Sequence, residues 1–159
     1  MGLLKKQKCL YAVCDGRSTK LSEVPDEALG GGMLGQGFAV EPEDGRFCSP
    51  ADGRVESVAE TGHAYTICTE DGLDVLVHIG VDTVRLHGEG FEPLVRQGQS
   101  VRAGTPLARV DLELLRSRGL PAITAVLVTN PEKIEDTDYR FGSTAGGKDA
   151  VMRFRIRKG

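Results

Sequence analysis

The sequence lacks any long apolar run, and no stretch approaches the ~20 residues that a helix needs to cross a bilayer. Its first ten residues mix lysines with a few apolar side chains, without the apolar core or cleavage site of a signal peptide. The net charge of −3 gives no general case for nucleic-acid binding, although a local acidic face could recognise a basic partner. We therefore expect a cytoplasmic, globular protein.

Patterns for disulfides and metal sites are also missing. The four cysteines form no Cys-x-x-Cys pair, and each lies in or beside an apolar, strand-like stretch: Cys9, Cys14, Cys48 and Cys68. We favour buried, reduced thiols over a disulfide framework. Three histidines and Asp82 could in principle bind zinc, but no His-x-x-x-His spacing supports a built-in metal site.

What the sequence does contain is a series of short strand-like segments. They run from 46 to 129 with turns between them and little helix. Pro25 can start a single helical turn, and Asp111 can cap a short helix over 112–118. We predict an all-β fold in one domain, residues 1–159: a compact antiparallel β-sandwich, barrel-like, with one or two short helices.

Several local expectations follow from composition. Three Asp-Gly-Arg tripeptides begin at Asp15, Asp44 and Asp52, and we interpret their Asp-Gly pairs as the turn conformation that joins two strands. The β-branched segment 123–128 predicts a central strand. We predict a polar loop over 131–148 and, from alternating apolar and basic residues, an edge strand over 152–157.

His78 ends the most apolar strand-like segment, just before a bend at Gly80. Alternation along this strand directs Val75, Val77 and Ile79 into the core. It leaves His78 on the other face, with an apolar residue beside polar ones, as in a docking surface. Its face is shared by Asp74, Leu76 and Gly80.

A second histidine, His63, precedes His78 by fifteen residues with Asp71-Gly72 between them. A four-residue loop would set His63 directly opposite His78, and a two-residue loop would set it opposite Gly80. Both registers place the imidazoles on one face, whereas an odd-length loop or a bulge would break this inference. The alternative is a half-buried histidine pair without chemistry. We interpret His87 as a loop residue.

These residues resemble a known family. The stretches His78–Val84 and Gly88–Phe91, with His63 upstream, are similar to the glucose-type enzyme IIA domain of the bacterial phosphoenolpyruvate-dependent sugar phosphotransferase system. Further matches in the same order cover nearly the whole chain: Glu23–Asp26, Met33–Gly35, Ser49–Gly53, Gly98–Val101 and Val128–Asn130.

The resemblance implies a phosphoryl carrier without a cofactor. His78 matches the histidine that accepts a phosphoryl group from the phosphocarrier protein HPr and passes it to a cysteine of a permease IIB domain. His63 matches the histidine needed for onward transfer, and Thr61 matches the threonine that orients it. The partner-binding residues implied are Asp26, Asp82, Leu29, Leu76 and Gly80. The chemistry suits a neutral imidazole, which attacks phosphorus without losing a proton.

The chain departs from the family pattern at a few positions. Gln36 stands where an aspartate is usual, and Leu29 and Leu76 occupy places where phenylalanine is common. The low aromatic content, 5%, fits a docking surface built from aliphatic side chains. These changes bear on the choice of partner more than on the chemistry.

Three other functions were weighed. A lipoyl- or biotin-type carrier needs a lysine at a hairpin tip, and the absence of any lysine between Lys20 and Lys133 argues strongly against it. A zinc-dependent hydrolase needs a third ligand beside His63 and His78, which could otherwise bind zinc only adventitiously. A regulatory binding module is compatible with phosphoryl transfer. The sugar is not encoded in this domain, and the chain ends favour a free-standing subunit.

Overall fold

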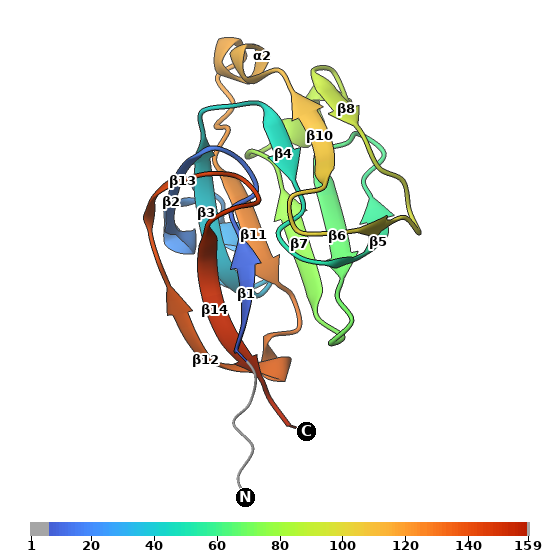
Figure 1. Ribbon diagram of the computed structural model, residues 1–159. Helices are drawn as coiled ribbons and strands as arrows, with labels where there is room; N and C mark the ends of the chain where they lie inside the picture. Colours follow the sequence, from blue (N-terminus) through green and yellow to red (C-terminus); the bar gives the residue numbers. More distant parts are fainter. Residues whose placement is uncertain (1–6, 159) are drawn as a thin grey trace, which may run out of the picture.

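The computed structural model describes residues 7–158, whose regular structure is mainly antiparallel β-sheet (Figure 1). The expectation about the first ten residues lies largely outside this range. The large sheet has the strand order β13 (Gly142–Thr144), β2 (Gly16–Lys20), β3 (Gln36–Pro42), β11 (Thr124–Val128), β7 (Asp74–His78), β6 (Ala64–Cys68), β5 (Gly53–Val58) and β9 (Ser100–Val101).

Two three-stranded sheets pack in front of the large sheet in the view of Figure 1. One has the order β1 (Gln7–Tyr11), β14 (Ala150–Ile156) and β12 (Ile134–Tyr139). The other has the order β4 (Arg46–Cys48), β10 (Pro106–Val110) and β8 (Phe91–Pro93). The predicted antiparallel β-sandwich is confirmed.

The helical elements are short. They are η1 (Leu21–Glu23), α1 (Glu27–Gly30), η2 (Thr83–Leu86), α2 (Leu112–Ser117) and η3 (Pro131–Lys133), where η marks a 3-10 helix. Asp111 Oδ1 accepts a hydrogen bond from Leu114 N (3.1 Å), so the predicted cap of α2 is confirmed. Within the described residues, no helix is long and apolar enough to cross a membrane.

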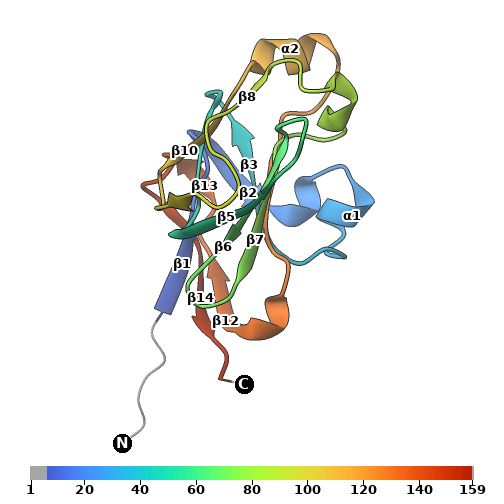
Figure 2. The same cartoon turned by 90° about the vertical axis from the view of Figure 1, so that its right-hand side faces the viewer.

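Apolar side chains cover both faces of the large sheet. The main core lies between the sheets, where Val75, Val77 and Ile79 of the β7 segment are fully buried, as predicted. Figure 2 shows α1 on the opposite face from β1 and β14. Beneath η1 and α1 a smaller apolar cluster forms from Val24, Leu29, Ala39, Val81, Ile123, Ala125 and Leu127, with Leu76 packed against it. All of β11 is buried, as expected of a central strand.

The Asp-Gly-Arg tripeptides do join strands, but not by the predicted turn conformation. None of their glycines has a positive φ. Instead, glycine is needed because a neighbouring backbone segment leaves no space for a side chain. A Cβ on Gly45 would lie 2.0 Å from the Val110 carbonyl oxygen. The preceding aspartates hold the connections together, since Asp44 Oδ1 accepts from Arg46 N (2.8 Å) and Asp15 Oδ1 from Gly146 N (2.9 Å).

Two expectations for the C-terminal region were wrong. Residues 131–148 contain β12 and β13, and β14 is the central strand of its sheet, not an edge. β12 is polar because its acidic residues form ion pairs with arginines in and just after β14: Asp136 with Arg155 (3.8 Å) and Glu135 with Arg157 (4.0 Å). Charge complementarity between strands therefore replaces the apolar alternation that identifies strands elsewhere.

All four cysteines are free thiols, as predicted. Cys14 and Cys48 are buried, whereas Cys9 and Cys68 are only half-buried. Burial raises the pKa of Cys48 to about 11 and that of Cys14 further still, so both remain protonated at neutral pH.

Candidate functional site

His78 is the last residue of β7, which lies between β6 and β11. Its neighbours across the sheet are Ala64 on one side and Ala125 on the other. Small side chains therefore flank the imidazole, which is half-buried and not covered. Because Val77 and Ile79 point into the main core, the backbone on both sides of His78 is firmly held.

The hydrogen bond of His78 fixes which nitrogen is free. Nδ1 lies 3.0 Å from the carbonyl oxygen of Gly80. A carbonyl oxygen can only accept, so Nδ1 of the neutral ring carries the hydrogen and Nε2 keeps its lone pair. A bend in the backbone at Gly80 places this carbonyl. The bend favours glycine because φ is +77° and a Cβ there would lie 2.5 Å from Thr83 Cγ2.

Both predicted registers for the histidine hairpin were wrong. The loop has an odd length, since Cys68 pairs with Asp74, and Ala64, not His63, lies opposite His78. His63 instead accepts a backbone hydrogen bond from Ile79 N (2.7 Å). In a continuous strand this register would send the side chain of His63 to the opposite face of the sheet.

The two imidazoles nevertheless meet. His63 lies just before β6, in a bend that follows Gly62 at φ +73°, so its side chain does not obey strand alternation. Its ring centroid lies 5.1 Å from that of His78, and the rings are nearly perpendicular at 83°. The predicted proximity is confirmed, but the bend produces it and not the strand register.

Thr61 contacts the second histidine directly. Its Oγ1 lies 2.5 Å from His63 Nδ1, and this hydrogen bond restrains the orientation of the imidazole. The bend itself rests on β8, because the space where a Cβ of Gly62 would lie is 3.1 Å from Pro93 Cγ and 3.3 Å from Phe91 Cβ. Packing against β8 thus positions the Thr61–His63 pair.

Both histidines favour the neutral form at neutral pH. Burial lowers the pKa of His78, and this shift is opposed in part by the Gly80 carbonyl and by the carboxylates of Asp26 and Asp82. Burial also lowers the pKa of His63, and the neighbouring His78 adds to that shift. A neutral His78 retains the Nε2 lone pair that a nucleophile requires.

Asp26 and Asp82 supply negative charge near His78 from two different segments. Asp26 caps α1, and its Oδ1 accepts hydrogen bonds from Ala28 N (2.9 Å) and Leu29 N (3.1 Å). Asp82 is exposed at the start of η2, with φ +60°. Neither carboxylate forms an ion pair within residues 7–158, so both are available to a basic partner.

The same two segments expose apolar side chains that sequence reasoning missed. Met33 is 80% exposed and Leu34 44%, in the loop after α1, and Val84 of η2 is 50% exposed. In the sequence, Met33 and Leu34 stand between glycines and Val84 stands next to Arg85, which are unusual places for core residues. Leu76 is half-buried on the His78 face, as predicted.

Other predicted site residues are placed differently. Leu29 is 2% exposed and belongs to the smaller apolar cluster, so direct partner contact through its side chain is excluded. Gly80 is also buried, and its backbone carbonyl oxygen is the hydrogen-bond partner of His78 Nδ1. His87 is an exposed loop residue, as expected. Gln36 donates a hydrogen bond from Nε2 to Thr137 Oγ1 (2.9 Å) and so links β3 to β12.

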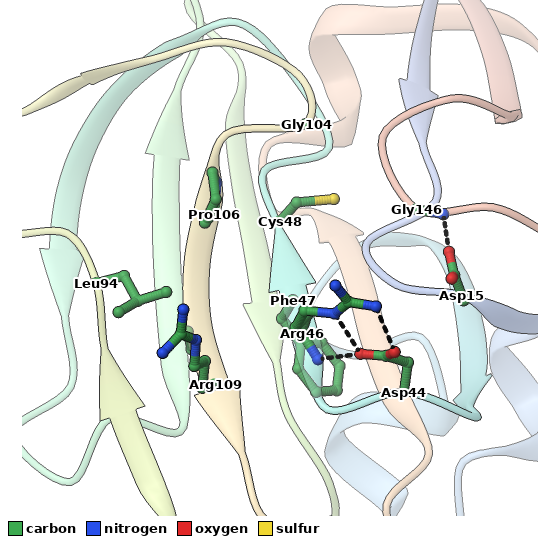
Figure 3. A pocket seen from close by; sticks show the side chains of 11 residues that line it. Asp15, Asp44, Arg46, Phe47, Cys48, Leu94, Gly104, Pro106, Arg109 and Gly146 are labelled. Carbon is green, nitrogen blue, oxygen red and sulfur yellow. Dashed lines mark hydrogen bonds and ion pairs between the residues drawn. The ribbon is translucent and has the colours of Figure 1, made fainter.

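Among residues 7–158, no cluster of three or more histidine, cysteine, aspartate or glutamate side chains could hold a metal ion. A pocket of about 300 Å³ lies beside β4 and β10 (Figure 3). Its rim holds Arg46, whose ion pair with Asp44 (2.8 Å) lowers the pKa of that carboxyl to about 2. No histidine lines this pocket, so it is separate from the imidazole pair.

A half-buried imidazole whose Nδ1 faces a carbonyl oxygen, a second imidazole beside it and exposed apolar and acidic surroundings form the candidate site. Comparison with known proteins specifies the class. Residues 8–134 match the family model described as phosphoenolpyruvate-dependent sugar phosphotransferase system, EIIA 1. The chain belongs to this family and is a phosphoryl carrier of the sugar phosphotransferase system, which confirms the resemblance seen in the sequence.

Individual relatives agree with this assignment. The chain is 35% identical over 158 residues to the glucose-specific EIIA component of Bacillus anthracis, covering 99% of this chain and 96% of that protein. It is 41% identical over 147 residues to the glucose-specific EIICBA component of Streptococcus pneumoniae, covering 92% of this chain and 20% of that protein. The solved glucose permease IIA from Mycoplasma capricolum superposes with a TM-score of 0.88 at 35% identity, covering 96% and 99% of the two chains.

Proposed function

We propose that Nε2 of His78 is the atom that carries the phosphoryl group, received from HPr and passed to a cysteine of a permease IIB domain. The observation that carries this proposal is the hydrogen bond between His78 Nδ1 and the Gly80 carbonyl, which leaves the Nε2 lone pair free. In the first transfer this lone pair attacks phosphorus as the bond to the donor breaks. No proton has to leave Nε2, so no general base is required.

Return of the phosphoryl group uses the same hydrogen bond. With Nδ1–H retained, phosphorylated His78 carries a formal positive charge, which the Gly80 carbonyl and the carboxylates of Asp26 and Asp82 stabilise. When a cysteine thiolate attacks phosphorus, the ring departs as neutral imidazole. The phosphoryl group is held covalently, and no cofactor enters the scheme.

His63 supplies a donor for the phosphoryl oxygens in this proposal. If the Thr61 hydroxyl donates to His63 Nδ1, the hydrogen of the neutral ring lies on Nε2. Charge accumulates on the equatorial oxygens during phosphoryl transfer, so a fixed N–H directed at them lowers the barrier. Thr61 then acts by orienting His63 and selecting its tautomer.

The surface around His78 suits two successive protein partners. Asp26 and Asp82 would attract the basic residues of HPr, while Leu76, Met33 and Val84 offer apolar contact area. Leu29 supports this surface from beneath, and Gly80 shapes it. A IIB partner is supported by the EIICBA component of Streptococcus pneumoniae, a longer protein that includes a region similar to this chain.

The proposal treats residues 1–159 as one IIA domain that acts in the cytoplasm, where phosphoenolpyruvate is available. Incubation with phosphoenolpyruvate, enzyme I and HPr should label the protein at one site that is labile to acid and stable to base. We expect the His78→Ala variant to remain unlabelled, with a circular dichroism spectrum like that of the parent. Labelling of this variant to the level of the parent protein would exclude His78 as the acceptor.

A further inference from the structure

A basic groove lies on the molecule at a distance from the histidine pair. It has a volume of about 590 Å³ and is formed by β13, the start of β14, the connections on either side of β13 and the end of β1. In the large sheet β2, β3 and β11 separate β13 from β7, which carries His78. In Figure 1, β13 and β14 lie on the left of the molecule, whereas β5 and β6 lie on the right. The groove therefore has no part in the phosphoryl transfer proposed at His78.

Three cations line the groove: Arg140, Lys148 and Arg153, all exposed. None of them forms an ion pair within the described part of the chain. Asp149 is the acid that lines the same groove, and its Oδ2 already accepts a hydrogen bond from Ala145 N (2.7 Å). Asp138 faces Arg153 across the sheet without forming an ion pair. The lining charges therefore sum to about +2 on a chain whose net charge is −3, which focuses positive potential here.

An aromatic surface borders the same groove. Phe141 is 42% exposed and stacks on Tyr139, with ring centroids 5.5 Å apart and planes 14° from parallel. Stacking on Tyr139 holds the Phe141 ring in place, and its exposed part can contact a planar ligand group in the groove. The hydroxyl of Thr144, which also belongs to the lining, is buried and has no hydrogen-bond partner among the described residues.

The groove is preorganised by backbone hydrogen bonds. Gly147 N donates to Ala12 O (2.8 Å), and Ala12 N donates to Asp149 O (2.9 Å), which fixes the loop that carries Lys148 on the end of β1. Arg140 N donates to Val151 O (2.8 Å), which fixes the opposite wall. Ligand binding therefore has to order only the side chains of the groove. The free-energy cost of ordering its backbone has already been met in folding.

We propose that this groove binds a small phosphate-bearing molecule with a planar ring, of the nucleoside polyphosphate class. Arg140, Lys148 and Arg153 contact the phosphate oxygens, and Phe141 stacks on the ring. The volume lies within the range of ligand sites in proteins. Two guanidinium groups and an ammonium group bind a phosphate ligand more strongly than a carboxylate ligand. Phosphate offers more acceptor oxygens and more negative charge.

The test uses ATP as the probe. Binding of ATP to the full chain is measured at low ionic strength by calorimetry and by changes in amide chemical shifts. We expect saturable binding with shifts centred on residues 140–153. Arg140→Gln and Lys148→Gln should each weaken binding about tenfold. Lys133→Gln removes a positive charge outside the groove and should leave the affinity within about twofold of the parent value.

Tripolyphosphate, which has no ring, distinguishes the contribution of the cationic side chains from that of Phe141. Phe141→Ala should weaken ATP binding about fivefold but leave binding of tripolyphosphate unchanged. His78→Ala should bind ATP as tightly as the parent protein, because the histidine pair is a separate site. All the exposed-residue variants should keep the melting temperature of the parent.

Four outcomes would overturn the proposal. They are no saturation by ATP below about 5 mM, loss of ATP binding in His78→Ala, equal weakening by Lys133→Gln and Arg140→Gln, and capture by acidic lipid vesicles through Arg140 and Lys148 without ATP binding. The last result would assign the groove to a membrane surface instead.

Discussion

In the proposed transfer the two nitrogens of His78 have separate roles, which follow from a backbone hydrogen bond. Nδ1 is bound to a carbonyl oxygen two residues along the chain, so the ring can neither rotate nor change tautomer without losing that bond. Nε2 is left to react. In His63 the partner of Nδ1 is a hydroxyl, which can donate or accept, so this ring can adapt to the protonation state of its neighbour.

This difference predicts separate phenotypes for the two histidines. His63→Gln should still accept a phosphoryl group at His78 but should donate it to the IIB cysteine about 100-fold more slowly, because a positioned donor to the phosphoryl oxygens is lost. Single-turnover transfer from the purified phosphorylated variant to a IIB domain measures the second step alone.

Thr61 variants provide the matched control for this effect. Thr61→Ser keeps the hydroxyl and should transfer at nearly the parent rate, whereas Thr61→Val should slow transfer in the same direction as His63→Gln. Equal onward transfer by His63→Gln and the parent protein would remove His63 from the mechanism.

Burial of the histidines also predicts how stability depends on pH. The folded-state pKa of His78 and that of His63 are lowered from the usual 6.5 of the unfolded chain. The unfolded state therefore binds more protons as the pH falls below that value, and the stability contributed by the neutral rings is lost on acidification. Urea unfolding at pH 7.5 and 5.5 should show a lower free energy of unfolding at the acidic pH.

Acidic residues titrate over part of the same range, so the informative quantity is a difference between proteins. The double variant His63→Gln, His78→Gln lacks both imidazoles and should lose less stability than the parent between the two pH values. The same loss in both proteins would show that the two histidines do not carry this pH dependence.

At the scale of elements, strands could be predicted from the sequence where one of their faces is apolar. The register in which neighbouring strands pair could not be predicted. Val75, Val77 and Ile79 defined β7 and its buried face from alternation alone. The loop before β7 has an odd length because Thr69 N closes it by a hydrogen bond to Leu73 O (2.9 Å), a choice that Asp-Gly at its centre does not encode. β12 was missed because its sequence is polar, and β13 because its partner, β2, lies near the other end of the chain.

The candidate site was predictable to the same extent. His63 and His78 could be brought together from the short hairpin between them, but the bend at Gly62 that joins them depends on packing against β8, about thirty residues away in sequence. Leu29 was assigned to the surface from family position alone, and its burial depends on how α1 lies on the large sheet.

The connection between β7 and η2 gives a sharp test of backbone geometry. Gly80→Ala should lower the free energy of unfolding by about 2–4 kcal/mol, because φ is +77° and the added Cβ would crowd Thr83 Cγ2 and the Pro121 carbonyl. Phosphorylation of His78 should slow as well, since the Gly80 carbonyl would move. Urea unfolding and labelling by HPr measure the two effects.

Gly98→Ala is the matched control, because Gly98 has φ +92° and no atom lies within 4 Å of the added Cβ. This variant should lose only about 1 kcal/mol from backbone strain and keep full phosphorylation. If both variants lost equal stability, crowding at Gly80 would not be the cause.

At the scale of the whole molecule, charge is distributed unevenly over two remote regions. Asp26 and Asp82 lie near the histidines, whereas Arg140, Lys148 and Arg153 line the groove beside β13. A net charge of −3 conceals this separation. Because exposed charges act mainly on the rate of encounter, the acidic pair should govern how fast a basic partner reaches His78.

Neutralising this pair should therefore slow phosphorylation without unfolding the protein. Asp26→Asn keeps a good helix cap, since asparagine caps as well as aspartate does, and the double variant Asp26→Asn, Asp82→Asn should accept phosphoryl groups from HPr about 10-fold more slowly at low salt. The difference from the parent should shrink as salt is raised to about 0.5 M, because screening weakens the attraction in the parent.

Asp138→Asn removes one exposed charge from β12 and serves as the control. It should phosphorylate at the parent rate, which would show that position and not total charge matters. A double variant as fast as the parent at low salt would mean that HPr reaches His78 without electrostatic attraction. The apolar side chains of Met33, Leu34 and Val84 would then have to account for partner recognition.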